Sequence, residues 1–129
     1  MRLWHQSLIP LLPRQQLLGQ HREICALRGK GWGRKHATVD YAFKYPPAFL
    51  VAYHMVVMQE MVRRGYHPDS IWTNPCWRGG TLGEESGWAD PDAVSDILEE
   101  RFPIYPEHNA EYLQECVDNL KQKGIVVFL

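Results

Sequence analysis

The side chains best suited to chemistry lie in one stretch of the chain, residues 13–36. Glu23 is a carboxylate that could move protons or stabilise a developing positive charge, and Arg22 beside it could hold an anionic group. The segment GKGWGRKH, residues 29–36, alternates glycine with lysine, tryptophan and arginine. Glycine permits close backbone approach, lysine and arginine neutralise phosphates, and tryptophan can stack on bases. This combination indicates nucleic-acid binding beside a carboxylate.

A helix is needed to position Glu23, and the sequence predicts one from about Pro13 to Arg28. Proline suits the first helical position and Gly29 the position just past the end. At 100° per residue, one stripe of this helix faces the core: Leu17, Leu18, His21, Ile24, Cys25 and Arg28. Glu23 then lies on the opposite, polar face with Gln16, Gly19 and Gln20.

Two interpretations of that polar face remain open. Gly19 lies one turn before Glu23, where glycine costs about 1 kcal/mol relative to alanine. It could allow another backbone or a ligand to approach the carboxylate closely. Alternatively, Glu23 is a solvated residue on an exposed face. Trp32 has a similar pair of interpretations, because it could contact bases or fold back onto the core.

Charge is unevenly distributed along the chain, although the net charge is −1. Residues 1–70 contain ten Lys/Arg and four Asp/Glu, whereas residues 71–129 contain four and eleven. Such a division is typical of a protein with one face for a polyanion. Alternatively, the two halves interleave in space and the basic patch is dispersed.

The remaining signals predict an all-α fold in one domain, residues 1–129, with about four helices. After the first helix, three more are expected: from Pro46-Pro47 to near Arg64, from Asp90 to about Arg101, and from Pro106 or Glu107 to near Lys123. Residues 29–45 are predicted to form a loop and a short strand or extended segment. Residues 66–89 are predicted to form a long loop rich in tryptophan, glycine and proline.

Several other function classes are disfavoured. No C-x-x-C, H-x-x-x-H, H-E-x-x-H or G-x-S-x-G pattern is present, so neither a metal nor another cofactor is expected. His54 is expected to be a core histidine rather than a ligand or base. Three cysteines far apart indicate reduced thiols in the cytoplasm. The longest apolar run, residues 48–57, is too short for a membrane span, and no secretory signal is predicted.

The N-terminal half resembles the pyrimidine-dimer DNA glycosylase and AP-lyase family, of the endonuclease V type. The resemblance runs through QQLLGQHRE (15–23), GRKH (33–36) and FKYPP (43–47). It continues into the helix that contains His54 and extends more loosely to IYPEH (104–108). It implies an all-helical fold, in agreement with the predicted helices.

The resemblance also implies a mechanism and a site. In this family the N-terminal α-amine, here that of Met1, attacks the sugar C1′, displaces the base and forms an imine, and β-elimination then cuts the strand. Glu23 matches the family's glutamate, and Arg22, Arg34 and Lys35 match its basic positions. The implied partner is damaged or abasic duplex DNA, bound by a monomer. The candidate DNA-binding residues are Arg2, Arg22, Arg28, Lys30, Trp32, Arg34, Lys35, His36 and Lys44.

The sequence departs from the family pattern in three places. Arg2 is too large for normal removal of the initiator methionine, so the reacting amine would be that of Met1. Gln16 stands where the family has a histidine, and the aromatic, basic C-terminal segment of the family is absent. A non-catalytic nucleic-acid-binding or interaction protein with the same fold is therefore the alternative, and a globular domain with an unrelated small ligand is a third hypothesis.

Overall fold

The computed structural model describes residues 1–129, and it is all-helical, as predicted. The α-helices are α1 (Arg14–Arg28), α2 (Pro47–Arg63), α3 (Gly79–Leu82), α4 (Pro91–Glu100) and α5 (Ala110–Gln122). Three 3-10 helices complete the fold: η1 (Gln6–Leu11), η2 (Asp40–Lys44) and η3 (Ser70–Thr73). The strand considered within residues 29–45 does not form, and η2 occupies part of that segment. The four predicted helices correspond to α1, α2, α4 and α5.

Most helix ends lie within one or two residues of those expected, because local capping determines them. The Asp90 side chain accepts a hydrogen bond from the backbone N of Asp92 and caps α4. The start of α5 is the exception, since Asn109, and not Pro106 or Glu107, supplies the cap by accepting from the backbone N of Tyr112. An Asx cap competes effectively with a proline start when both lie near the beginning of a helix.

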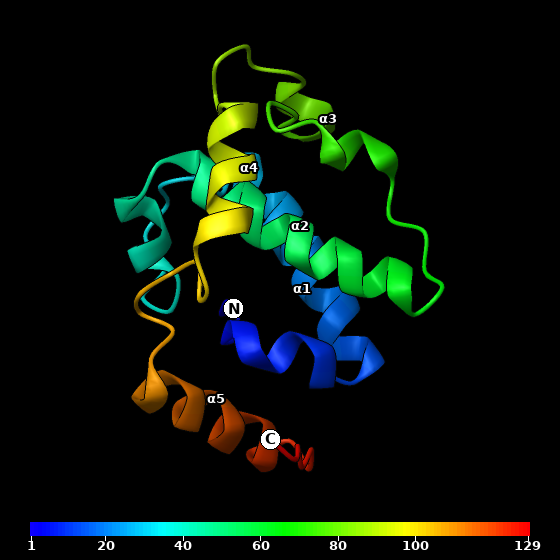
Figure 1. The fold of residues 1–129 in the computed structure, drawn as a ribbon, viewed down its shortest axis with the longest axis vertical. Coiled ribbons are helices and arrows are strands. Elements are labelled where there is room, and N and C mark those ends of the chain that lie inside the picture. Colours follow the sequence, from blue (N-terminus) through cyan, green and yellow to red (C-terminus); the bar gives the residue numbers. More distant parts are fainter.

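Helix α2 is central to the fold and packs against both α1 and α4 (Figure 1). Its buried face includes Leu50, Val51, Tyr53 and Val57, each fully shielded from solvent. These residues belong to one hydrophobic cluster that also takes in residues of the N-terminal segment, α1, α4 and α5. The positions of α1, α2 and α5 relative to one another therefore depend on a shared core.

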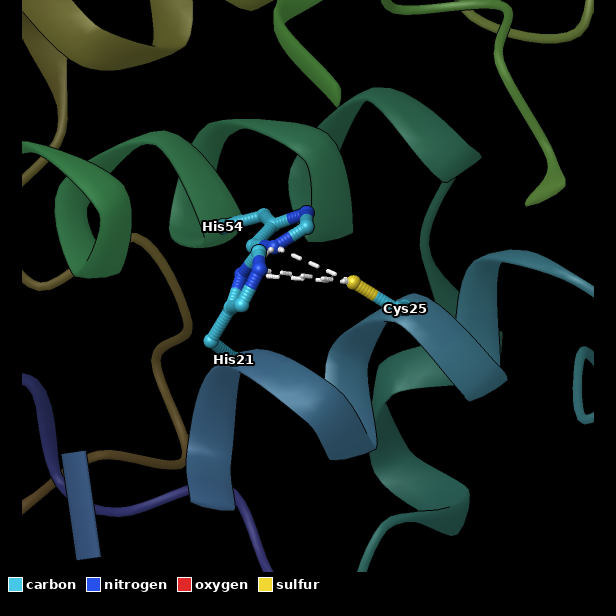
Figure 2. A group of neighbouring side chains, drawn as sticks. All are labelled: His21, Cys25 and His54. Atoms are coloured by element: carbon cyan, nitrogen blue, oxygen red, sulfur yellow. Dashed lines mark hydrogen bonds between the residues drawn. The ribbon is translucent and has the colours of Figure 1, made fainter. Parts of the chain in front are cut away.

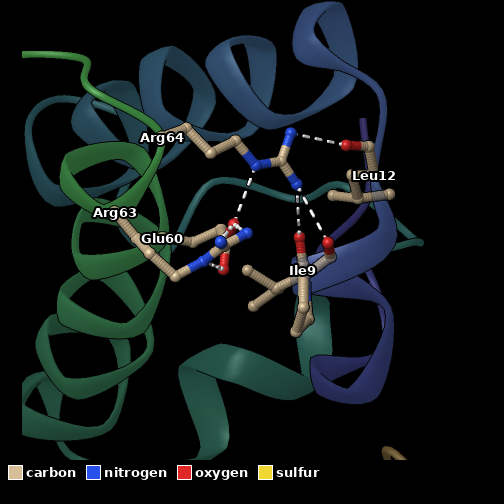
Figure 3. Close-up of polar contacts among 6 residues, drawn as sticks. Ile9, Leu12, Glu60, Arg63 and Arg64 are labelled. Atoms are coloured by element: carbon tan, nitrogen blue, oxygen red, sulfur yellow. Dashed lines mark hydrogen bonds and ion pairs between the residues drawn. The ribbon is translucent and has the colours of Figure 1, made fainter.

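The N-terminal segment is firmly packed, in contrast to the fraying that is usual at chain termini. Leu3, Trp4 and Leu8 are buried in the core cluster. At the far end of the segment, Arg64 donates hydrogen bonds from Nη1 to the carbonyl of Leu12 (2.8 Å) and from Nη2 to that of Pro10 (3.1 Å) (Figure 3). These contacts fasten η1 to the C-terminal end of α2.

Helix α5 lies beside the first residues of the chain, although more than a hundred residues separate them in sequence (Figure 1). The Tyr112 hydroxyl donates to the carbonyl of Leu3. Arg2 Nη1 lies 3.5 Å from Glu115 Oε1 in an ion pair. Cys116 and Leu120 on the same helix are fully buried in the shared core. The C-terminal helix therefore helps to fix the position of the N-terminus.

The segment predicted as a long loop, residues 66–89, contains η3, α3 and a single antiparallel bridge between Trp77 and Glu84. Arg78 fastens this segment to the end of α1, donating from Nε to the carbonyl of Arg28 (2.8 Å) and from Nη2 to that of Gly29 (3.1 Å). The tryptophan-rich segment is thus a packed part of the fold.

All three cysteines are free thiols, as their number and spacing predicted. None of the helices combines the length and the apolar character that crossing a bilayer requires.

Candidate functional site

A pocket of about 220 Å³ opens at the N-terminus of the chain. It is lined by Met1, Arg2, Trp4, Glu23, Thr38, Asn119 and Lys123. Four parts of the sequence therefore meet there: the first residues, α1, the segment before η2, and the C-terminal end of α5. The pocket brings together the two residues that the family resemblance paired, Met1 and Glu23.

Gln20 is the residue that joins the N-terminal segment to Glu23. Its Oε1 accepts a hydrogen bond from the backbone N of Trp4 (2.7 Å), and its Nε2 donates to the carbonyl of Arg2 (2.9 Å). The same Nε2 lies 3.3 Å from Oε2 of Glu23. Gln20 is almost completely buried, although helical periodicity placed it on the polar face. Gln20 therefore does not face solvent, because the N-terminal segment folds across this part of α1, while Glu23 is half-buried.

Met1 is held at its carbonyl, which accepts a hydrogen bond from the Thr38 hydroxyl. The methionine remains partly open, with 44% of its surface exposed. Its amine has no protein hydrogen bond and no ion pair within 4.0 Å. The backbone is fixed while the amine stays free for a ligand.

Glu23 is half-buried and has no ion-pair partner. Burial raises the pKa of its carboxyl group above the ordinary value, and nearby positive charges oppose that rise. The opposing charges are the N-terminal ammonium, Lys123, Arg22 and His36. A carboxyl group whose pKa is moved toward neutrality is better suited to exchanging protons with a substrate than an ordinary solvated glutamate.

Four pocket residues were not identified from the sequence: Trp4, Thr38, Asn119 and Lys123. The ring of Trp4 lies 5.8 Å from the guanidinium carbon of Arg2 and 5.3 Å from Nζ of Lys123, so it stacks with two cations. Lys123 appeared in the sequence only as a helix end, and no local pattern marks Asn119. Both reach the pocket through the tertiary contact between α5 and the N-terminus.

The predicted basic residues other than Arg28, which is described below, are exposed or partly exposed. Those with exposed side chains are Arg22, Lys30, Arg34, Lys35, His36 and Lys44. Arg2 is partly buried and paired with Glu115. The exposed group lies on α1, the glycine-rich loop and η2, so these cations remain available to an anionic ligand.

Trp32 packs against the protein instead of projecting from it. Its ring makes edge contacts with Phe43 (centroids 5.0 Å apart) and Trp88 (5.5 Å). The guanidinium carbon of Arg78 lies 4.7 Å from the Trp88 ring and extends this cluster. Of the two interpretations of Trp32, the structure shows the one in which the ring folds back onto the core.

Arg28, one of the candidate DNA-binding residues, is completely buried and does not face a ligand. Its guanidinium donates to the carbonyls of Trp72 (2.8 Å), Asn74 (2.7 Å) and Trp77 (3.0 Å). The prediction that Arg28 lies on the core-facing stripe of α1 is thus confirmed. The assignment of Arg28 to the DNA-binding surface is wrong. Its function in the fold is to hold η3 and the segment that follows it against α1.

His21, Cys25 and His54 form a cluster that sequence spacing did not reveal, because its third member comes from another helix (Figure 2). His21 Nδ1 lies 2.8 Å from His54 Nε2, and Cys25 Sγ lies 3.9 Å from each of these nitrogens. Histidine and cysteine at such distances are a donor set that soft or borderline metal ions prefer.

The neighbour of this cluster favours a hydrogen-bond chain over metal binding. Arg28 Nη1 lies 3.0 Å from His54 Nδ1 and can only donate, so the ring proton of His54 lies on Nε2. That nitrogen then donates to His21 Nδ1, whereas a metal ion would need Nε2 without its proton. Burial also raises the pKa of the Cys25 thiol to about 11, which disfavours the thiolate. His54 is a buried, hydrogen-bonded core histidine, as expected.

Comparison with known families identifies the family to which the chain belongs. The family model described as pyrimidine dimer DNA glycosylase matches residues 1–74, more than half of the chain. The chain therefore belongs to the pyrimidine dimer DNA glycosylase family. Neither a curated protein nor a solved structure matches the chain.

Proposed function

We propose that this protein is a DNA glycosylase and AP lyase that removes damaged bases, with pyrimidine dimers as the substrate class, through an imine formed by its N-terminal amine. The observation that carries the proposal is the pocket in which Met1 and Glu23 both lie. Membership of the family supports a DNA substrate. The amine and the carboxylate are the reacting pair.

In the first step the neutral amine of Met1 attacks C1′ of the damaged nucleotide. A bond forms between nitrogen and C1′, and the bond from C1′ to the base breaks with its electron pair leaving on the base. An α-amine has a reference pKa of roughly 7.7–8.0, against about 10.4 for lysine, so a useful fraction of such groups is neutral near pH 7. The sugar then opens, and the nitrogen becomes part of an iminium.

Glu23 acts on the charges and protons of that sequence. Its carboxylate stabilises the positive charge on the sugar, and it accepts and returns the protons that move during ring opening. In the elimination, loss of a C2′ proton drives cleavage of the bond between C3′ and its phosphate oxygen. Burial raises the pKa of Glu23 and the surrounding cations oppose that rise, so the carboxyl group takes up a proton more readily than an ordinary solvated glutamate.

Exposed cations would hold the duplex beside the pocket. Arg22 lies on α1 next to Glu23, while Arg34 and Lys35 lie on the loop that follows. Each phosphate neutralised adds salt-dependent affinity. Chemistry at a stacked nucleotide also requires distortion or flipping of the DNA. Trp32 is excluded as the inserted aromatic residue, because it packs against Phe43 and Trp88.

The second candidate function is DNA binding without catalysis. One observation favours it: Arg2 follows Met1, so the amine keeps a bulky methionine side chain. This hypothesis predicts salt-sensitive binding to duplex DNA without strand cleavage or a covalent adduct.

The test is borohydride trapping with the native, untagged chain and a duplex that contains one abasic site. We expect a trapped adduct that disappears when the N-terminal amine is acetylated and that forms far more slowly in Glu23→Gln. Glu99→Gln, an exposed carboxylate on α4, is the matched control and should trap normally. Retained DNA binding with no trapped band would favour the non-catalytic function, and a band that survives acetylation would place the nucleophile elsewhere.

A further inference from the structure

One polar atom of the pocket is shielded from solvent and yet has no hydrogen-bond partner. Asn119 lines the pocket, and its Oδ1 is shielded from solvent and accepts no hydrogen bond. An amide oxygen left in that state costs roughly 1–3 kcal/mol compared with one that is hydrogen-bonded. Such orphaned acceptors are uncommon in folded proteins, and they gain a partner when a ligand or a moving group supplies a donor.

Helix α5 fixes the position of Asn119. Tyr112, Cys116, Asn119 and Lys123 follow one another at spacings of three or four residues, so they share one face of the helix. That face is held at several points, since the Tyr112 hydroxyl donates to the carbonyl of Leu3 and Cys116 is completely buried. The amide is therefore presented to the pocket by a rigid element.

Most donors that line the pocket already have another contact. The Thr38 hydroxyl donates to the carbonyl of Met1, and Arg2 is paired with Glu115 at 3.5 Å. Nζ of Lys123 lies over the ring of Trp4, 5.3 Å from its centroid. The amine of Met1 has no hydrogen bond and no ion pair with the protein, so its N–H groups are free to donate to Oδ1 of Asn119.

We propose that Asn119 is a positioning residue for the reaction, whose Oδ1 accepts a hydrogen bond from the Met1 amine and then from the N–H of the iminium. This inference rests on the proposed function. A neutral amine that donates one N–H to Asn119 has its lone pair restricted in direction, which favours attack on C1′. After attack the nitrogen is cationic, so the same hydrogen bond becomes charge-assisted and stronger.

Glu23 and Asn119 then have separate tasks. Glu23 exchanges protons and can carry a negative charge, whereas an amide oxygen accepts a hydrogen bond without taking the proton. The neutral amide therefore orients the amine and leaves it free to lose its proton. A carboxylate in the same place would favour the protonated, unreactive ammonium.

The test compares Asn119→Leu, Asn119→Asp and a control, Gln122→Leu, which removes an exposed amide from the same helix. Each untagged chain is mixed with the abasic duplex at saturating concentration, and the rate of borohydride trapping is measured from pH 5 to 9. Asn119→Leu is expected to slow trapping by about 10- to 100-fold through misplacement of the amine, with DNA affinity nearly unchanged. Gln122→Leu should trap as the wild type does.

Asn119→Asp provides the readout that a purely structural role would not change. It retains an acceptor oxygen, so its maximal rate should exceed that of Asn119→Leu. Its negative charge favours the ammonium, so the pH of half-maximal trapping should rise. Should Asn119→Leu fail to fold, this pH profile alone decides, and a profile identical to the wild type overturns the proposal.

Two further results would also count against Asn119. A wild-type rate for a folded Asn119→Leu overturns its role, as does an equal loss in Gln122→Leu. Both results leave the proposed function intact, because the wild-type adduct still forms. If the wild type gives no adduct, the proposed function fails, and the role of Asn119 fails with it.

Discussion

Glu60 and Glu23 are two shielded glutamates on adjacent helices with opposite surroundings. Glu60, near the end of α2, is clamped by two arginines, with Nε of Arg63 at 3.0 Å and Nε of Arg64 at 2.7 Å (Figure 3). Glu23 on α1 has no cation within ion-pair distance, and its one side-chain hydrogen bond is from the Gln20 amide at 3.3 Å. One carboxylate is saturated with partners and the other is left open.

Their pKa shifts follow from this difference. The hydrogen bonds from Arg63 lower the pKa of Glu60, and the one from Arg64 adds to the effect against the opposing influence of burial. For Glu23 burial is the largest influence and raises the pKa. A carboxylate that stabilises a fold keeps its charge and its contacts, whereas one that serves chemistry needs free lone pairs and an accessible proton. The comparison therefore assigns a structural role to Glu60 and supports the chemical role proposed for Glu23.

The largest expected effect is on activity. Glu23→Gln should lower the single-turnover rate of strand cleavage by about 10²- to 10⁴-fold, the usual contribution of a general acid–base group. The substituted amide can still accept the hydrogen bond from Gln20, so the melting temperature should not fall. The measurement is cleavage of the abasic duplex together with a thermal melt. Normal cleavage by Glu23→Gln would remove the distinction between the two glutamates.

Glu60→Gln should do the reverse and lower stability while cleavage per folded molecule stays the same. The substitution removes the charged acceptor from Arg64, whose side chain is 20% exposed. We expect a loss of roughly 1–3 kcal/mol in the free energy of unfolding, as is typical for hydrogen bonds to a charged group. Urea unfolding measures it. An unchanged midpoint would show that Arg64 is held by the η1 carbonyls alone.

The pH dependence of stability should sharpen the contrast, because the two shifts have opposite signs. The lowered pKa of Glu60 gives stability that is present above its ordinary value of 4.5 and is lost as the pH falls through the folded value. The raised pKa of Glu23 gives stability that is present below 4.5 and is lost as the pH rises through the folded value. Glu23→Gln should therefore gain stability relative to the wild type as the pH rises above 4.5.

The matching measurement on Glu60→Gln should show its deficit shrinking as the pH falls below 4.5. Urea unfolding of both variants and the wild type from pH 3 to 7 gives the two difference curves. Parallel curves would mean that the two carboxyl groups experience similar environments, contrary to the geometry.

The helices could be predicted because their sequence signals are local. The surroundings of Glu23 could not be predicted, since they arise from tertiary contacts. Proline starts, an Asx cap and terminal glycines fixed α1, α2 and α4 closely. Periodicity also placed Arg28 correctly in the core stripe. The same periodicity placed Gln20 in solvent, since it contains no information about a terminal segment that folds back over the helix.

Sequence patterns could not predict which residues from distant parts of the chain come together. Asn119 and Lys123 enter the pocket through the packing of α5 on the N-terminus, and His54 joins His21 and Cys25 across two helices. The pairing of Met1 with Glu23 came from family resemblance and not from spacing. Thr38, which holds the carbonyl of Met1, carries no sequence signal of its own.

The smallest expected effect concerns the space next to Glu23. A Cβ atom at Gly19 would lie 3.8 Å from Nη2 of Arg22 and within 4 Å of nothing else. No part of the protein therefore needs this glycine for close approach. Gly19→Ala should raise the free energy of unfolding by about 0.5–1 kcal/mol, the helix-propensity difference between the two residues.

A thermal melt of Gly19→Ala measures this gain, with Gly31→Ala as the contrasting variant. A Cβ at Gly31 would lie 2.8 Å from the backbone oxygen of Ala26, so that substitution should destabilise the protein. Gly19 lowers the stability of the free protein and lies one turn from the unpaired carboxylate of Glu23. A ligand that occupies the space beside Gly19 would explain this glycine. Gly19→Ala should then weaken binding of the abasic duplex while it stabilises the free protein. A gain in stability with unchanged binding would show that no ligand occupies the open space beside Glu23.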